Sequence, residues 1–314
     1  MTKLAKLRLI LIVNVLGLAF ISACSRDSQD QTTAVTPVSP PPNQVLQVVP
    51  RPEKILQLMK QRGEQDEAQP ELKIISPANN SVIKGDVVPV RLALSGDLRG
   101  YQPHKDPATE AGNHIHVILD NEPYEAYYEL GQPFELRNVA AGKHTLRVFP
   151  SRPLHESYKN AGAFQMVTFT VEGGGDTSKV TSTTDGQRMA NNNSGQAARE
   201  GKDVAASKAG AVDLAKPLLT YSRPKGEYKG TDADSIMIDF WLSNAKLKGD
   251  GGEYRVRYII DDDEARFIDT WQPIWLSGWT AGPHSVRIEL LGQDGYPVEN
   301  GGYNTTTREI TVVK

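Results

Sequence analysis

The sequence contains a single cysteine, Cys24, among its 314 residues. One thiol cannot build an intramolecular disulfide framework or a cysteine-rich zinc site. An excess of one charge is also missing, because 35 Lys and Arg residues against 38 Asp and Glu residues leave a net charge of −3. A chain without a basic excess has no general attraction for nucleic acid, so we expect no nucleic-acid partner.

Recognisable enzyme motifs are missing as well. The sequence has no G-x-S-x-G nucleophile elbow, no Walker A loop and no G-x-G-x-x-G dinucleotide motif. His155-Glu156 begins an H-E-x-x-H motif, but Lys159 stands where the second His is required. The sequence therefore predicts a protein that is not an enzyme. A hydrolase whose residues converge only in the fold, using His155 or Glu156, is the alternative.

The apolar run at the N-terminus is too short for a transmembrane helix. It covers the 12 residues Leu9 to Phe20, whereas a spanning helix needs about 20. Basic residues precede it, which is typical of a secretory signal. The segment Ile21-Ser22-Ala23-Cys24 then resembles a bacterial lipobox. The resemblance implies that residues 1–23 are a signal peptide and that the sulfur of Cys24 is lipidated.

The lipoprotein resemblance also implies a location. Two or more acyl chains on one residue anchor a protein stably to a membrane. We therefore expect a lipid-anchored protein of the bacterial cell envelope. Ser25 follows the cysteine, which in the lipoprotein pattern favours the outer membrane if the host is Gram-negative.

Composition divides the mature chain into two folded units. Residues 24–70 begin with a segment rich in Ser, Thr, Gln and Pro, and residues 173–213 contain Gly and Asn triplets with few large apolar residues. Such segments bury too little apolar surface to fold alone, so we expect a disordered tether and a disordered linker. The folded units are then residues 71–172 and 214–314.

The two units match each other in sequence. The segment 115–120 matches 256–261, and 141–148 matches 281–288, at an offset of about 140 residues. Ile115, Val117 and Leu119 alternate with period two, as do many other apolar residues of both units. We predict an all-β protein made of two immunoglobulin-like β-sandwiches in tandem. The chain resembles the immunoglobulin-like modules of bacterial surface lipoproteins, a broad class without a common ligand. We expect a non-catalytic role in binding or adhesion to an envelope polymer or a protein.

Histidines are concentrated in the first unit. His114 and His116 share one face of a strand, opposite the inward Ile115. His104 and His155 lie in two loops, about 96–112 and 150–162, that meet at the same end of an immunoglobulin-like sandwich. Convergent imidazoles predict a Cu or Zn site, completed by Glu156 or water. The alternative is a solvated outer face with ordinary surface histidines and no cofactor.

Other side chains suggest a binding surface or a structural role. Two further histidines, His144 and His284, occupy matching positions at a strand entry. We predict that they are structural and hydrogen-bond to the turn backbone. Trp275 is predicted to face outward, where its ring could stack on a sugar or anchor a partner. The alternative is that the ring packs under a neighbouring loop. The candidates for an anionic, glycan or protein partner are Arg147, Arg152, Tyr158, Lys159 and Trp275.

Overall fold

Strands make up nearly all of the regular structure in this computed structural model, which describes residues 44–174 and 200–314. The predicted signal peptide, Cys24 with the start of the predicted tether, and part of the predicted linker lie outside these ranges. Within the described ranges, no helix is long and apolar enough to cross a membrane.

The first sandwich consists of two sheets. One sheet has the order β10-β7-β4-β2, and the other has the order β3-β9-β8-β5-β6. Their strands are β2 (Gln69–Ser76), β3 (Ser81–Lys84), β4 (Val88–Asp97), β5 (His114–Leu119), β6 (Glu125–Tyr127), β7 (Phe134–Arg137), β8 (Gly142–Ser151), β9 (Gln165–Glu172) and β10 (Gly201–Asp203).

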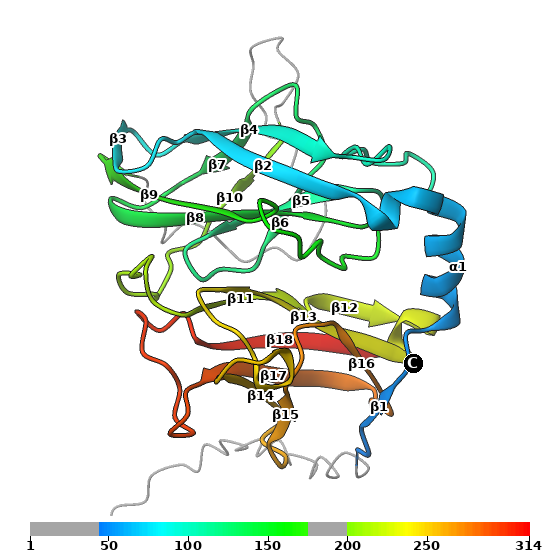
Figure 1. Cartoon of the computed structure of the whole chain (residues 1–314). Helices are drawn as coiled ribbons and strands as arrows, with labels where there is room; N and C mark the ends of the chain where they lie inside the picture. Colours follow the sequence, from blue (N-terminus) through cyan, green and yellow to red (C-terminus); the bar gives the residue numbers. More distant parts are fainter. Residues whose placement is uncertain (1–43, 175–199) are drawn as a thin grey trace, which may run out of the picture. The chain divides into compact units, whose positions relative to one another are not determined.

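The second sandwich repeats this arrangement. Its sheets have the orders β1-β16-β13-β11 and β12-β18-β17-β14-β15. Their strands are β1 (Gln47–Val49), β11 (Leu218–Arg223), β12 (Gly226–Lys229), β13 (Ser235–Ser243), β14 (Arg255–Ile260), β15 (Arg266–Ile268), β16 (Ile274–Ser277), β17 (Gly282–Leu291) and β18 (Thr305–Val313). Figure 1 shows the two layers of strands in each sandwich.

The strand order confirms the predicted fold class. In each sandwich, the strands that correspond to A, B and E form one sheet, and C, F and G lie in the other, as in immunoglobulin-like domains. The alternating residues point as predicted, because Ile115, Val117 and Leu119 belong to the core of the first sandwich. Ile236 and Ile238 likewise belong to the core of the second sandwich. Burial of these apolar side chains holds each pair of sheets together.

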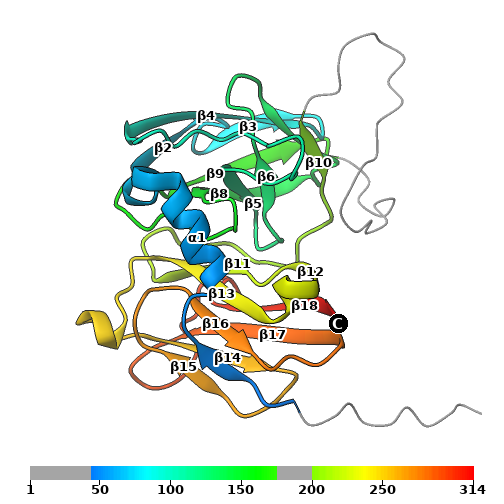
Figure 2. The same ribbon diagram turned by 90° about the vertical axis from the view of Figure 1, so that its right-hand side faces the viewer.

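The segment before the first sandwich is more ordered than predicted. Residues 44–70 contain β1, the helix α1 (Glu53–Arg62) and a 3-10 turn, η1 (Gly63–Glu67). β1 pairs with β16 of the second sandwich, so α1 connects a strand of the second sandwich to the first strand of the first (Figure 2). Residues 201–203 of the expected linker likewise form β10, which pairs with β7. Each segment finds its backbone partners on the edge of a sheet, which a composition argument does not detect.

The two sandwiches contact each other through buried side chains. All of the described residues belong to one compact unit. Phe149 of the first sandwich stacks with Trp241 of the second at a ring-centroid distance of 6.0 Å, and Phe164 stacks with the same ring at 5.3 Å. Every residue of β5 and of β11 is buried. The outward faces of these strands are therefore covered by the neighbouring sandwich and not by solvent.

Candidate functional site: a three-histidine cluster

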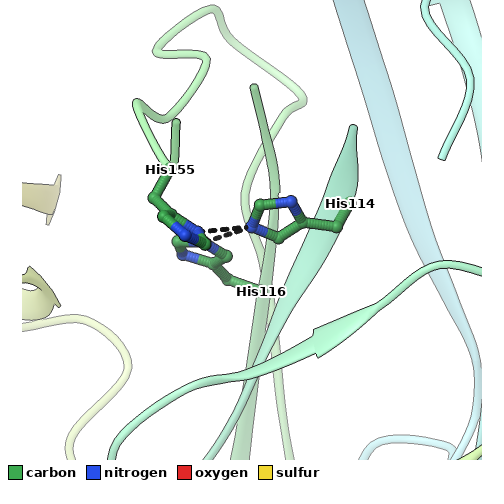
Figure 3. A group of neighbouring side chains, drawn as sticks. All are labelled: His114, His116 and His155. Atoms are coloured by element: carbon green, nitrogen blue, oxygen red, sulfur yellow. Dashed lines mark hydrogen bonds between the residues drawn. The ribbon is translucent and has the colours of Figure 1, made fainter. Parts of the chain in front are cut away.

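Two of the clustered histidines come from one strand. β5 begins at His114, and His116 follows on the same face, while Ile115 lies in the core on the other side. His155 comes from the loop between β8 and β9. Figure 3 shows the three rings pointing toward one another. The cluster thus lies on the outer face of the first sandwich, at the end where this loop meets the start of β5.

The ring nitrogens are spaced like the ligands of a metal ion. His114 Nε2 lies 3.0 Å from His116 Nε2 and 3.0 Å from His155 Nδ1. The ligand atoms of all three residues lie within 4.8 Å of one another. In a tetrahedral zinc site, Zn–N bonds of about 2.0–2.1 Å place neighbouring nitrogens about 3.3 Å apart. The two distances from His114 Nε2 are close to that value.

One hydrogen bond determines which nitrogen of His114 carries the proton. His114 Nδ1 donates to the carbonyl oxygen of Gly112 at 2.8 Å. The lone pair is therefore on Nε2, which faces the other two rings. A single lone pair accepts one well-aligned hydrogen bond, so His114 Nε2 can accept from only one of its two neighbouring rings at a time. A metal ion would use the lone pairs of all three.

Burial keeps the cluster neutral. His114 and His116 have no exposed surface, and His155 is partly exposed. Burial lowers the pKa of His114 to about 4 and the pKa values of His116 and His155 well below the ordinary value. Neutral imidazole is the form that binds metals, so all three residues are in the ligand form at neutral pH.

Tyr124 and the second sandwich close the cluster. The Tyr124 ring stacks on His116 at a centroid distance of 3.6 Å, and its hydroxyl lies 3.1 Å from His155 Nδ1. Ser222 of β11 places its hydroxyl 3.3 Å from His116 Nδ1. The sequence gives no signal for these partners. Ser222 belongs to the other half of the chain, and Tyr124 lies in the connection between β5 and β6, whose path over the sheet the sequence does not specify.

Positive charge lies next to the cluster. Arg223 lies over the Tyr124 ring at 5.2 Å and Lys225 at 4.6 Å, and both add to the lowering of the histidine pKa values. Net charge therefore does not attract a cation to this site, and the imidazoles must supply the affinity. Such a site favours Cu and Zn, which bind imidazole well, over Ca²⁺ and Mg²⁺, which prefer oxygen ligands.

Two predicted ligands do not join the cluster. His104 is exposed and is not among the three residues whose ligand atoms converge. Glu156 is buried, and its carboxylate accepts a hydrogen bond from Arg51 at 2.8 Å. The predicted solvated outer face is also incorrect for His114 and His116. These residues point away from the sandwich core as predicted, but the second sandwich and Tyr124 cover them.

Arg147 points outward from the core, but it is not available to a ligand. It is fully buried and donates to the Thr220 hydroxyl of the second sandwich at 2.7 Å. It also donates to the Asp120 carbonyl oxygen. The expectation of a free cation on this strand is therefore not met.

The cationic side chains of the β8–β9 loop are engaged inside the molecule. Arg152 donates to Asp66 Oδ1 at 2.9 Å and lies over the Tyr158 ring at 3.9 Å. Tyr158 is buried, and its hydroxyl donates to the Gln65 carbonyl oxygen at 2.7 Å. Lys159 donates to Asp239 of the second sandwich at 2.7 Å. These contacts hold the loop and leave little of it to meet an anionic partner.

Trp275 packs under a neighbouring segment, which was the alternative to a sugar-stacking role. Its exposed fraction is 5%. Val49 of β1 pairs with it in the sheet, and the Arg51 guanidinium lies over its ring at 5.1 Å. The ring is therefore covered by a part of the chain that was expected to be disordered.

The structural role of His144 and His284 is confirmed. His144 Nε2 bonds to the Ala140 carbonyl oxygen at 2.8 Å, and His284 Nε2 bonds to that of Thr280 at 2.9 Å. In both, Nδ1 faces a carboxylate, that of Asp120 at 2.8 Å and that of Asp261 at 2.6 Å. The carboxylate partners were not predicted. The repeat carries the signal for them, because the two aspartates occupy matching positions.

Comparison with known proteins does not assign a family. No family model and no curated protein matches the chain. Similar solved structures include fibronectin(III)-like modules of Clostridium thermocellum CbhA, at 10% identity over 77% of this chain and 93% of that chain, with a TM-score of 0.23.

Two further solved structures have comparable similarity. The fibronectin-III array of RIM-binding protein matches at 10% identity over 79% of this chain and 69% of that chain, with a TM-score of 0.22. The D00-D0 domain of intimin matches at 8% identity over 78% of this chain and all of that chain, with a TM-score of 0.20. At these scores the likeness carries no functional argument, and the fold assignment rests on the strand order of the chain itself.

Proposed function

We propose that this chain is a lipid-anchored, non-catalytic protein of the bacterial cell envelope that binds one Zn(II) or Cu(II) ion through His114, His116 and His155. The observation that carries the proposal is the convergence of three neutral ring nitrogens, with His114 Nε2 at 3.0 Å from each of the other two. Tetrahedral and tetragonal nitrogen sites of this kind suit Zn and Cu.

The anchoring part of the proposal rests on the sequence around Cys24, which resembles a lipobox. A cysteine that carries two or more acyl chains would hold the protein at a membrane surface. Ser25 favours the outer membrane if the host is Gram-negative. The residues involved lie outside the described part of the chain.

Enclosure of the cluster supports binding rather than catalysis. His114 and His116 have no exposed surface, and Tyr124 stacks directly on His116. A catalytic metal site keeps a position open for water or substrate, whereas a closed site holds the ion. The residues that we expected to meet a polymer or glycan are engaged in internal contacts, so metal binding is better supported than polymer binding.

Calorimetric titration tests the proposal. Zn(II) and Cu(II) are titrated into the full chain in detergent, in a Cys24→Ser background that removes its one thiol. We expect one ion per chain. The His114→Ala/His116→Ala variant should bind more than about 100-fold more weakly, because loss of outer partners alone costs 10–100-fold.

His104→Ala is the matched control, because this histidine is exposed and lies in the same sandwich outside the cluster. It should bind as the unsubstituted chain does. Weak, nonstoichiometric heats that the double variant shares would refute the proposal.

A further inference from the structure

The segment 44–68, which we call the strap, is attached firmly to the second sandwich at its start. β1 pairs with β16, and Leu46 is part of the second core. Gln44 accepts a hydrogen bond from the Thr280 backbone N–H at 3.0 Å. The start of the strap is therefore fixed on the second sandwich, although the histidines that it reaches belong to the first.

The end of the strap contacts the loops that carry the histidines. Arg62 donates to the Asn113 side chain at 2.7 Å and to the Tyr158 hydroxyl at 3.0 Å. Asn113 directly precedes His114. Arg152 donates to the Asp66 side chain at 2.9 Å and to its carbonyl oxygen at 2.8 Å. One end of the strap thus holds the residue before β5, and it holds the β8–β9 loop on either side of His155, at Arg152 and Tyr158.

Two further contacts hold the loop between those points. Arg51, just after β1, donates to Glu156 at 2.8 Å. The apolar side chains Leu58 and Met59 of α1 line, with Leu154, a cavity of about 20 Å³ between the helix and the loop. This cavity has room for about one water molecule, so helix and loop are in near contact.

His155 itself has a backbone conformation that needs support. Its φ is 66°, in the left-handed region that non-glycine residues seldom adopt. Such conformations persist where the surroundings impose them. The residues on both sides, Arg152 and Glu156, are those that the strap holds. Without these contacts the loop could relax, and the imidazole would then turn away from His114.

We infer that the strap positions the metal site, by holding His155 in the conformation that places its Nδ1 beside His114 and His116. This inference rests on the proposed function for its metal readout. Arg62 and Asp66 are positioning residues, because they act through the loop and contact none of the three rings. The strap, the part of the described chain closest in sequence to Cys24, thereby controls the affinity of the site.

The test combines strap variants with loss of His155. Zn(II) affinity is measured for Arg62→Ala and Asp66→Asn in the full chain with Cys24→Ser, each with and without His155→Ala. We expect each strap variant to weaken binding about 10-fold or more, in line with other outer-shell changes. In the His155→Ala background the same variant should cost nothing further. A merely destabilising change would cost the same in both backgrounds.

A metal-free readout separates this inference from the proposed function. Modification of each histidine by diethylpyrocarbonate is followed by mass spectrometry. His155 should react faster in Arg62→Ala and Asp66→Asn than in the unsubstituted chain, while exposed His104 reacts equally in all. If Zn(II) fails to bind but this acceleration is seen, the inference that the strap positions His155 is supported and the proposed function is refuted.

Lys54→Ala is the control on the same helix, because its ion pair is exposed and joins it to Asp232 and not to the β8–β9 loop. It should change neither affinity nor modification. Unchanged affinity and unchanged His155 modification in both strap variants would overturn the inference. Equal affinity losses with and without His155 would overturn it as well.

Discussion

His144 has an acceptor at each ring nitrogen, the Asp120 carboxylate at Nδ1 and the Ala140 carbonyl oxygen at Nε2. Only the protonated ring donates to both. Burial lowers the pKa of His144, but the hydrogen bond and the charge of Asp120, together with the carbonyl, outweigh this and raise the pKa above its ordinary value. The charged form is therefore part of the folded structure.

A pH prediction follows for this residue. Because the folded pKa lies above the unfolded value, the contribution of His144 is fully present below about pH 6.5 and is lost as pH rises through the folded pKa. Replacing His144 with Asn should lower the free energy of unfolding by about 1–3 kcal/mol at pH 5.5 and by less at pH 8.5. Denaturant titration at both pH values measures this, and an equal loss at both would contradict it.

Some residue roles could be predicted from sequence and others could not. Strand parity and the repeat identified His144 and His284 as structural residues, because both sit at the same strand entry. Parity also placed His114 and His116 on one outward face. It could not show that Ser222 lies against His116, since sequence spacing says nothing about which outer face meets another domain.

The chain just before β1 approaches the residue just after β16 closely, and that residue is a glycine. Gly278 has φ of 93°, and a Cβ there would lie 2.1 Å from the carbonyl oxygen of Val45. Glycine alone allows both this conformation and this approach. The attachment of the strap to the second sandwich therefore depends on the absence of a side chain at Gly278.

Gly278→Ala should detach β1. We expect a loss of at least about 1 kcal/mol in the free energy of unfolding and faster amide hydrogen exchange across residues 45–49. Gly131→Ala is the matched control, because a Cβ at that glycine would meet no atom within 4 Å. Protection of residues 45–49 that is unchanged by Gly278→Ala would refute this account of β1.

Elements were predicted best where one face meets a core. Alternation identified β4, β5, β13 and β14, because one side of each strand is packed with apolar residues. It failed for β1 and β10, which are only three residues long and are held by backbone pairing on a sheet edge. Such short strands leave no periodic signal in the sequence.

The two sandwiches are joined by a buried ion pair as well as by aromatic rings. The Asp239 side chain is 1% exposed and accepts from Lys159 at 2.7 Å and from the Ser157 hydroxyl at 2.6 Å. Removal of the Asp239 carboxylate would leave the Lys159 ammonium and the Ser157 hydroxyl without this acceptor. The same loop carries His155, so the interface and the histidine cluster share one segment.

Asp239→Ala should therefore strongly destabilise the folded protein. We expect a loss of about 3–5 kcal/mol in the free energy of unfolding, as for other broken buried ion pairs. Asp232→Ala is the control, because its ion pair with Lys54 is exposed and contributes less than about 1 kcal/mol. Chemical denaturation of the two variants measures the difference, and similar losses in both would contradict a buried interface.

X-ray absorption at the zinc edge tests the central claim most directly, because it identifies the ligands of the bound ion. The sample is the full chain with one equivalent of Zn(II), in the Cys24→Ser background. The account predicts three imidazole ligands at about 2.0–2.1 Å, falling to two in His155→Ala and staying at three in His104→Ala. A zinc ion held mainly by carboxylates or water, with the same spectrum in His155→Ala, would contradict it.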